Sequence, residues 1–274
     1  MTETGQVRFP AYTAHCPKGV LEMKLTIARC HKDSSGRMPP HVLAKVMETA
    51  VKRQMEAWGW GRETMETKNV TLVVGWTSIQ IRRLPHVGEN LLVRVWPSRK
   101  KSAMYVHKYA FFTDAGEALA SAAVLFLPMD RTSRKLTAAG IPVLPEVVIP
   151  GEADVPSLRR AFPTKLPNQA VRTVRAHEID ENGHMNNTCY LQWANELWKD
   201  DHRRQHEPRS IWVQYANELM EGQTVTLDYV VQGQHLYVRG SVNQTDSFLA
   251  VIQYGSPPMA EIVSKKVSSQ GEYR

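Results

Sequence analysis

The chain repeats one order of elements twice, and this repeat limits the fold more strongly than any other feature of the sequence. Each half carries a helix-like segment that is followed by a series of strand-like runs. An offset of 147 residues superimposes the segments before the two helices, and an offset of 134 superimposes the segments after them. The superimposed pairs include Asp33 with Asp180, Gly36 with Gly183, Met38 with Met185, and Gly88 with Gly222. A shared order of elements at a long period indicates two copies of one folding unit.

The spacing of apolar residues predicts the elements of each copy. In residues 39–58 the apolar positions recur at three- and four-residue steps, which is typical of an amphipathic helix. A second helix is expected over residues 186–204. Shorter apolar runs bounded by turn residues are typical of antiparallel strands; they cover 69–83, 89–97, 104–113, 118–128, 168–178, 210–219, 223–232, 235–244 and 248–255. The sequence therefore predicts an α+β fold, with one helix and one antiparallel β-sheet in each copy.

A proline-rich segment separates the two copies. Six prolines fall within residues 142–167, and such a composition is typical of a linker that runs over a protein surface. We therefore expect an N-terminal domain over residues 1–140, a linker over 141–168 and a C-terminal domain over 169–274.

The stretch DENGHMNN, residues 180–187, carries the most reactive side chains of the sequence. Asp180, Asn182 and His184 stand at alternate positions, so an extended loop would present all three to one side. Asn186 and Asn187 follow at the start of the second helix, where asparagine is commonly a cap and where free backbone N–H groups can stabilise an oxyanion. We expect no metal site, because no second His or Cys lies at ligand spacing.

The first copy lacks these reactive groups. Ser35 and Arg37 superimpose on Asn182 and His184, and Leu84 superimposes on Glu218. We therefore expect one working site, built mainly by the second copy.

The stretch DENGHMNNTCYLQW resembles the Asp-x-Asn-x-His-x-Asn-Asn-x-x-Tyr-x-x-Trp signature of acyl-ACP thioesterases of the plant and bacterial type. The stretch IRRLPHVGENLLVRVWP is similar to a strand turn of the same family. The resemblance implies a tandem double hotdog fold, in which each hotdog is a long helix wrapped by an antiparallel sheet. It also implies a cofactor-free thioester hydrolase (EC 3.1.2 type) of fatty acid biosynthesis, with acyl carrier protein as partner and with the acyl-chain pocket in the first domain. Candidate walls of that pocket are Met47, Met55, Trp58 and Trp76.

The resemblance also suggests roles for the site residues. The family places a Glu-Cys pair after the second helix, and here Leu219 follows Glu218, which rules out a cysteine nucleophile at that position. We expect Glu218 to be the general base, Asn182 and His184 to bind water or polarise the carbonyl, and Asp180 to orient its neighbours. The roles of Asp180 and Glu218 could be reversed.

The net charge of the chain indicates which kind of partner it can bind. The formal net charge is +7 and the sequence pI is about 9.3, which favours an acidic partner such as a carrier protein. No nucleic-acid motif accompanies the basic clusters, and no apolar stretch is long enough to span a bilayer. The chain starts without an apolar run and has only three cysteines, so we expect a cytoplasmic protein with reduced thiols.

Three other functions are compatible with the same residues. An acyl-CoA thioesterase would use the same site, with basic residues facing the nucleotide phosphates. A hotdog hydratase or dehydratase also binds acyl thioesters, although its usual motif spaces Asp and His further apart. The third alternative is a non-catalytic acyl-binding protein. The presence of the reactive residues in one copy and their absence from the other argue against this interpretation. The sequence leaves open whether two chains form a homodimer, and it leaves the acyl chain length open.

Overall fold

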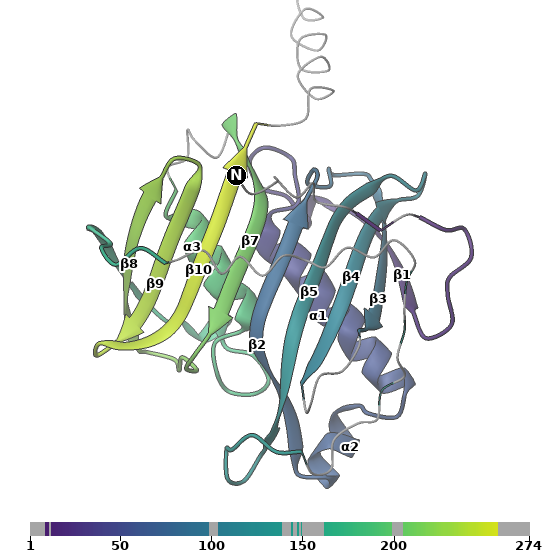
Figure 1. Cartoon of the computed structure of the whole chain (residues 1–274), viewed down its shortest axis with the longest axis horizontal. Helices are drawn as coiled ribbons and strands as arrows, with labels where there is room; N and C mark the ends of the chain where they lie inside the picture. Colours follow the sequence, from purple (N-terminus) through teal and green to yellow (C-terminus); the bar gives the residue numbers. More distant parts are fainter. Residues whose placement is uncertain are drawn as a thin grey trace, which may run out of the picture.

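The computed structural model describes residues 9–10, 12–98, 104–138, 144, 147, 149, 162–198 and 205–256. Within these ranges the chain forms one ten-stranded antiparallel sheet with helices on one face (Figure 1). The strand order is β1-β3-β4-β5-β2-β7-β10-β9-β8-β6. Because β2 pairs with β7, the two halves of the chain share a single sheet. No helix of the described residues is both long and apolar enough to cross a membrane.

The first half forms β1 to β5 and two helices. The strands are β1 (Leu21–Thr26), β2 (Val70–Ile81), β3 (Asn90–Pro97), β4 (Tyr105–Thr113) and β5 (Ala118–Asp130). A short 3-10 helix, η1 (Arg29–His31), precedes α1 (Pro40–Ala57), and α2 (Arg62–Thr67) follows it. Pro40 suits the first turn of α1 because its missing N–H would have no partner there.

The second half repeats this order. It forms β6 (Asn168–Thr173), η2 (Ala176–Glu178), α3 (Asn187–Glu196), β7 (Glu207–Tyr215), β8 (Thr224–Gln232), β9 (His235–Val242) and β10 (Thr245–Gly255). The helix expected over 186–204 is therefore shorter, since its regular turns end at Glu196; residues 199–204 lie outside the described ranges. The strand expected over 168–178 ends at Thr173, and the 3-10 helix η2 occupies residues 176–178 instead.

Equivalent backbone hydrogen bonds confirm the alignment of the two copies. Gly88 N–H donates to Ile27 O at 2.9 Å, and Gly222 N–H donates to Val174 O at 2.9 Å. Likewise Met38 N–H bonds Pro85 O at 2.8 Å, and Met185 N–H bonds Leu219 O at 2.7 Å. These partners differ by the same offsets of 147 and 134 residues as the sequence alignment.

The core lies between the helices and one face of the sheet, where alternate strand residues meet the apolar stripes of α1 and α3. One continuous apolar cluster contains Leu43 and Met47 of α1, Trp193 of α3 and strand residues from both halves. Figure 1 shows α1 behind the first half of the sheet and α3 behind the second half.

Several described residues of the expected linker pack on the opposite face of the sheet, whereas Leu144 packs against the main core cluster. Val147 contacts the cluster around Trp96, and Phe162 and Leu166 contact the cluster around Trp212. Most of residues 141–161 lies outside the described ranges, as do the basic clusters at 99–101, 159–160, 203–204 and 265–266.

Candidate active site

The loop between η2 and α3 carries Asp180, Asn182 and His184, and it is a tight turn. Asp180 N–H donates to His184 O at 3.0 Å, and Gly183 N–H donates to Asp180 O at 3.0 Å. Asp180 Oδ1 also accepts the Asn182 N–H at 2.8 Å, and Gly183 adopts φ of 83°. The expectation of an extended loop is therefore wrong. The Asn182-Gly183 dipeptide is the sequence signal that favours a turn here.

The turn nevertheless brings the three side chains to one place. Asp180, Asn182 and His184 all line a cavity of about 860 Å³. Glu218 lines it too, and its Oε1 lies 3.4 Å from His184 Nε2. This separation is slightly longer than a normal hydrogen bond, and such contacts commonly tighten when substrate binds. The four predicted residues thus line one cavity together.

Glu218 lies in a loop rather than in a strand. The strand expected over 210–219 ends at Tyr215, because the N–H groups of Ala216 and Asn217 both turn to Ser247 O. Leu219 is buried, and its N–H donates to Tyr190 Oη at 3.2 Å. The pair Glu218-Leu219 therefore has one side chain at the cavity and one in the core.

Asn186 is the N-cap of α3. Its Oδ1 accepts the Thr188 N–H at 2.9 Å and the Thr188 hydroxyl at 2.6 Å. Asn187 is the first residue of the helix and lines the cavity, while its carbonyl accepts the Tyr215 hydroxyl at 3.2 Å. The positive end of the α3 dipole is therefore close to the four polar residues.

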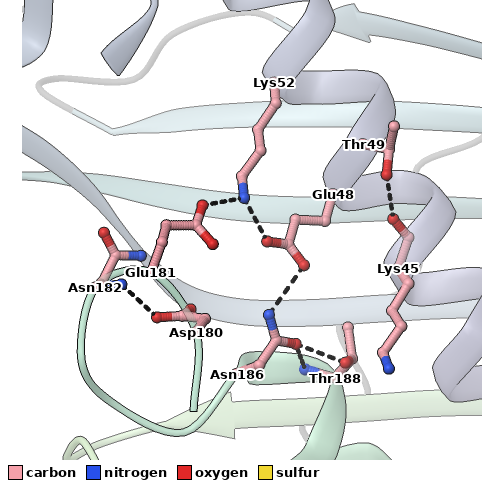
Figure 2. A network of polar contacts seen from close by, with 9 residues as sticks. All are labelled: Lys45, Glu48, Thr49, Lys52, Asp180, Glu181, Asn182, Asn186 and Thr188. Atoms are coloured by element: carbon pink, nitrogen blue, oxygen red, sulfur yellow. Dashed lines mark hydrogen bonds and ion pairs between the residues drawn. The ribbon is translucent and has the colours of Figure 1, made fainter. Parts of the chain in front are cut away.

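A polar network joins this helix end to α1 of the first half (Figure 2). Asn186 Nδ2 donates to Glu48 Oε2 at 3.1 Å, and Lys52 Nζ lies 2.8 Å from Glu48 Oε1. Lys52 also bonds Glu181, and this hydrogen bond holds the pKa of the Glu181 carboxyl below its usual range. The sequence alone does not predict that Glu48, Lys52 and Glu181 meet at this network. Their only local signal was the four-residue spacing of Glu48 and Lys52 on a helix.

The rest of the cavity wall is mostly apolar and comes largely from the first half. Met47 and Met55 line it, as expected, whereas Trp58 and Trp76 are not among its lining residues. Trp60 lines it instead. Other apolar lining residues include Ala44, Val51, Met65, Leu72, Val74, Val124, Phe126 and Leu127. An elongated apolar substrate would fit such a wall.

The motif's other aromatic and sulfur residues are buried, and Tyr190 also lines the cavity. Tyr190 and Trp193 are buried, and Trp193 Nε1 donates to Glu178 Oε1 at 2.6 Å. Cys189 is a buried free thiol, and burial raises its pKa to about 11. A thiol of this kind is a poor nucleophile at neutral pH.

The equivalent loop of the first copy has the same backbone conformation, but its side chains at the equivalent positions differ. Ser35 Oγ donates to Asp33 Oδ1 at 2.6 Å, and the buried Arg37 forms an ion pair with Glu207 of β7. Leu84, the equivalent of Glu218, is buried. Charge pairing and apolar packing thus replace the cavity residues of the second copy.

Within the described ranges, no group of three or more His, Cys, Asp or Glu side chains lies together in a way that could hold a metal ion.

Two models of known protein domains match the chain, and both describe the same family. A family model of the acyl-ACP thioesterase N-terminal domain matches residues 19–148, and a model of the C-terminal domain matches residues 164–251. No curated protein matches the chain by sequence.

Two solved structures are similar over most of the chain. An acyl-ACP thioesterase from Bacteroides thetaiotaomicron has a TM-score of 0.79 and 18% sequence identity, covering 86% of this chain and 98% of its own. The 12:0-ACP thioesterase from Umbellularia californica has a TM-score of 0.77 and 17% identity, covering 88% of this chain and 99% of its own. These likenesses confirm the expected α+β tandem double hotdog fold.

Proposed function

The chain belongs to the acyl-ACP thioesterase family and hydrolyses acyl-ACP to free fatty acid and carrier protein, and we propose that Asp180, Asn182, His184 and Glu218 carry out this reaction. The observation that supports this assignment is the 3.4 Å separation of His184 Nε2 and Glu218 Oε1 at a large, mostly apolar cavity. An acyl thioester would match this cavity, with its carbonyl at the polar residues and its acyl chain along the apolar wall.

Glu218 is the proposed general base. It accepts a proton from a water molecule, whose oxygen attacks the thioester carbonyl carbon. The tetrahedral oxyanion then collapses and the C–S bond breaks. The carrier thiolate that leaves accepts the proton from Glu218. Asp180 is less suited to this role, because one of its carboxylate oxygens already accepts the Asn182 N–H at 2.8 Å. We therefore assign to Asp180 the role of orienting its neighbours Asn182 and His184 within the turn.

His184 and Asn182 are the proposed water-binding and carbonyl-polarising groups. The oxyanion lies near the N-terminus of α3, where Asn187 lines the cavity and the helix dipole favours negative charge. Asn186 holds this helix end in place, since its side chain is engaged with Thr188 and Glu48.

The proposed division of labour follows the two copies. Residues 1–140 form the domain that holds the acyl chain, residues 141–168 form the linker, and residues 169–274 form the catalytic domain. Support comes from α1, α2, β2 and β5, which supply most of the apolar cavity wall. The carrier is held in part by charge, because a chain with a net charge of +7 attracts an acidic protein.

Single-turnover hydrolysis of a panel of acyl-ACPs and acyl-CoAs tests the assignment. We expect fatty acid release from acyl-ACP, with a large loss of rate in His184→Ala and Glu218→Gln. The matched control is Ser35→Ala, because Ser35 is the first-copy equivalent of Asn182. This variant should keep the wild-type rate. Full activity of Glu218→Gln would refute its role as base. Faster release from acyl-CoA, with no response to ionic strength, would favour CoA as the carrier.

A further inference from the structure

The turn that follows β5 contains a non-glycine residue in a left-handed conformation. Arg134 has φ of 57°, a backbone region that costs free energy for a residue with a side chain. Asp130 holds the turn closed: its Oδ1 accepts the N–H of Ser133 at 2.7 Å and of Thr132 at 3.1 Å. Arg134 N–H donates to Asp130 O at 2.9 Å. Such strained positions persist only where their surroundings fix them, and they cluster at functional sites.

A second left-handed residue fixes the base of this turn. Asn69, with φ of 53°, precedes β2, and its Nδ2 donates to Asp130 Oδ2 at 2.8 Å. Its Oδ1 accepts the Thr132 hydroxyl at 3.0 Å, and its carbonyl accepts the Arg131 N–H at 3.0 Å. The turn is thus fastened to the residue that precedes β2, which fixes the backbone from which the Arg134 side chain extends.

Arg134 reaches the site of the other half. Its guanidinium forms an ion pair with Glu218 Oε2, while Glu218 Oε1 is the oxygen that lies 3.4 Å from His184 Nε2. The carboxylate therefore lies between a cation of the first half and an imidazole of the second. With one oxygen anchored by Arg134, the other is directed at His184.

We propose that Arg134 is a positioning residue for hydrolysis, which anchors one oxygen of Glu218 so that the other can accept the proton of the attacking water. This inference rests on the proposed role of Glu218 as base. It means that the catalytic half depends on the first half for the alignment of its base, in addition to the wall of the acyl pocket.

Lys135, the next residue along the chain, provides a matched control. Its side chain is exposed, and Lys135 is not among the residues that line the cavity. Lys135→Met thus removes one cation beside Arg134 without removing the ion pair with Glu218. Arg134→Met is expected to fold, because the Arg134 side chain is half exposed.

The experiment compares Arg134→Met, Arg134→Lys and Lys135→Met on two substrates. One is acyl-ACP, and the other is an acyl-N-acetylcysteamine thioester, which has neither carrier nor phosphate. For Arg134→Met we expect kcat to fall by roughly 10- to 100-fold on both substrates, as for a misplaced catalytic group, with little change in KM. Arg134→Lys should recover part of the rate, because lysine keeps the charge but not the planar fork. Lys135→Met should keep the wild-type rate.

A double mutant separates this inference from the function on which it rests. If Arg134 acts through Glu218, Arg134→Met should cause no further loss in a Glu218→Gln background. A loss confined to the KM for acyl-ACP would overturn the inference and make Arg134 a carrier contact. Wild-type kcat in Arg134→Met, beside an inactive Glu218→Gln, would overturn it and leave the proposed function intact. Full activity of Glu218→Gln would instead refute the proposed role of Glu218 as base, on which this inference rests.

Discussion

The ion pair between Arg37 and Glu207 offers a sharp test of how the two copies are held together. Arg37 occupies the position that His184 has in the second copy, and Glu207 begins β7. Their side chains are only 4% and 1% exposed, so both charges are removed from water. Arg209 Nη1 lies 3.4 Å from Glu207 Oε2 and is partly exposed. We predict that Arg37→Met destabilises the protein strongly, because it leaves the Glu207 carboxylate buried beside a weaker partner.

The expected magnitude follows from the burial of the pair. Removing one partner of a buried pair typically costs about 3–5 kcal/mol, because the remaining charge is uncompensated. Since Arg209 can neutralise part of the Glu207 charge, we expect the lower end, about 3 kcal/mol. Replacing both residues by apolar ones in Arg37→Met/Glu207→Leu should restore most of this loss, because no buried charge then remains.

Urea unfolding at pH 7 measures these differences. For a chain of this size the m-value is about 3 kcal/mol per molar urea, so Arg37→Met should lower the midpoint by roughly 1 M. The exposed pair Arg62–Glu66 is the control, and Arg62→Met should leave the midpoint unchanged. An Arg37→Met midpoint equal to that of the wild type, or a double mutant as unstable as the single one, would refute the reasoning.

Three further predictions concern single residues. Burial lowers the pKa of His107 to about 4, so below pH 6.5 the unfolded chain binds a proton that the folded chain does not. The free energy of unfolding should therefore decrease as the pH falls from 6.5 to 4, and His107 should account for up to roughly 3 kcal/mol of this decrease. In unfolding measured as a function of pH, His107→Leu should abolish this contribution. Asn186→Ala should cost about 1 kcal/mol in urea unfolding through the lost cap, and it should also lower kcat by releasing the contact to Glu48. Gly36→Ala and Gly183→Ala should each cost about 1–2 kcal/mol, because both glycines have φ near +80°, but only Gly183→Ala should slow hydrolysis. Equal kinetic effects of the two glycine variants would contradict a single working site.

The sequence by itself determined the repeat, the α+β class and the location of the reactive residues. These conclusions depend on information that is local along the chain, such as apolar periodicity, turn residues and the spacing of Asp180, Asn182 and His184. The alignment of the two copies also predicted that Ser35, Arg37 and Leu84 would replace the polar side chains of the second copy, and the backbone hydrogen bonds confirm this correspondence.

The tertiary structure alone decided which distant residues meet at the site. Arg134 contacts Glu218 across 84 residues of sequence, and Glu48 contacts Asn186 across 138 residues. The pairing of β2 with β7, which joins the halves into one sheet, is equally non-local. No periodicity or short motif encodes such contacts, because they arise from how preformed helices and strands pack to bury their apolar faces. For this reason the sequence predicted the residues at the centre of the site, and the fold supplied the residues that hold them in place.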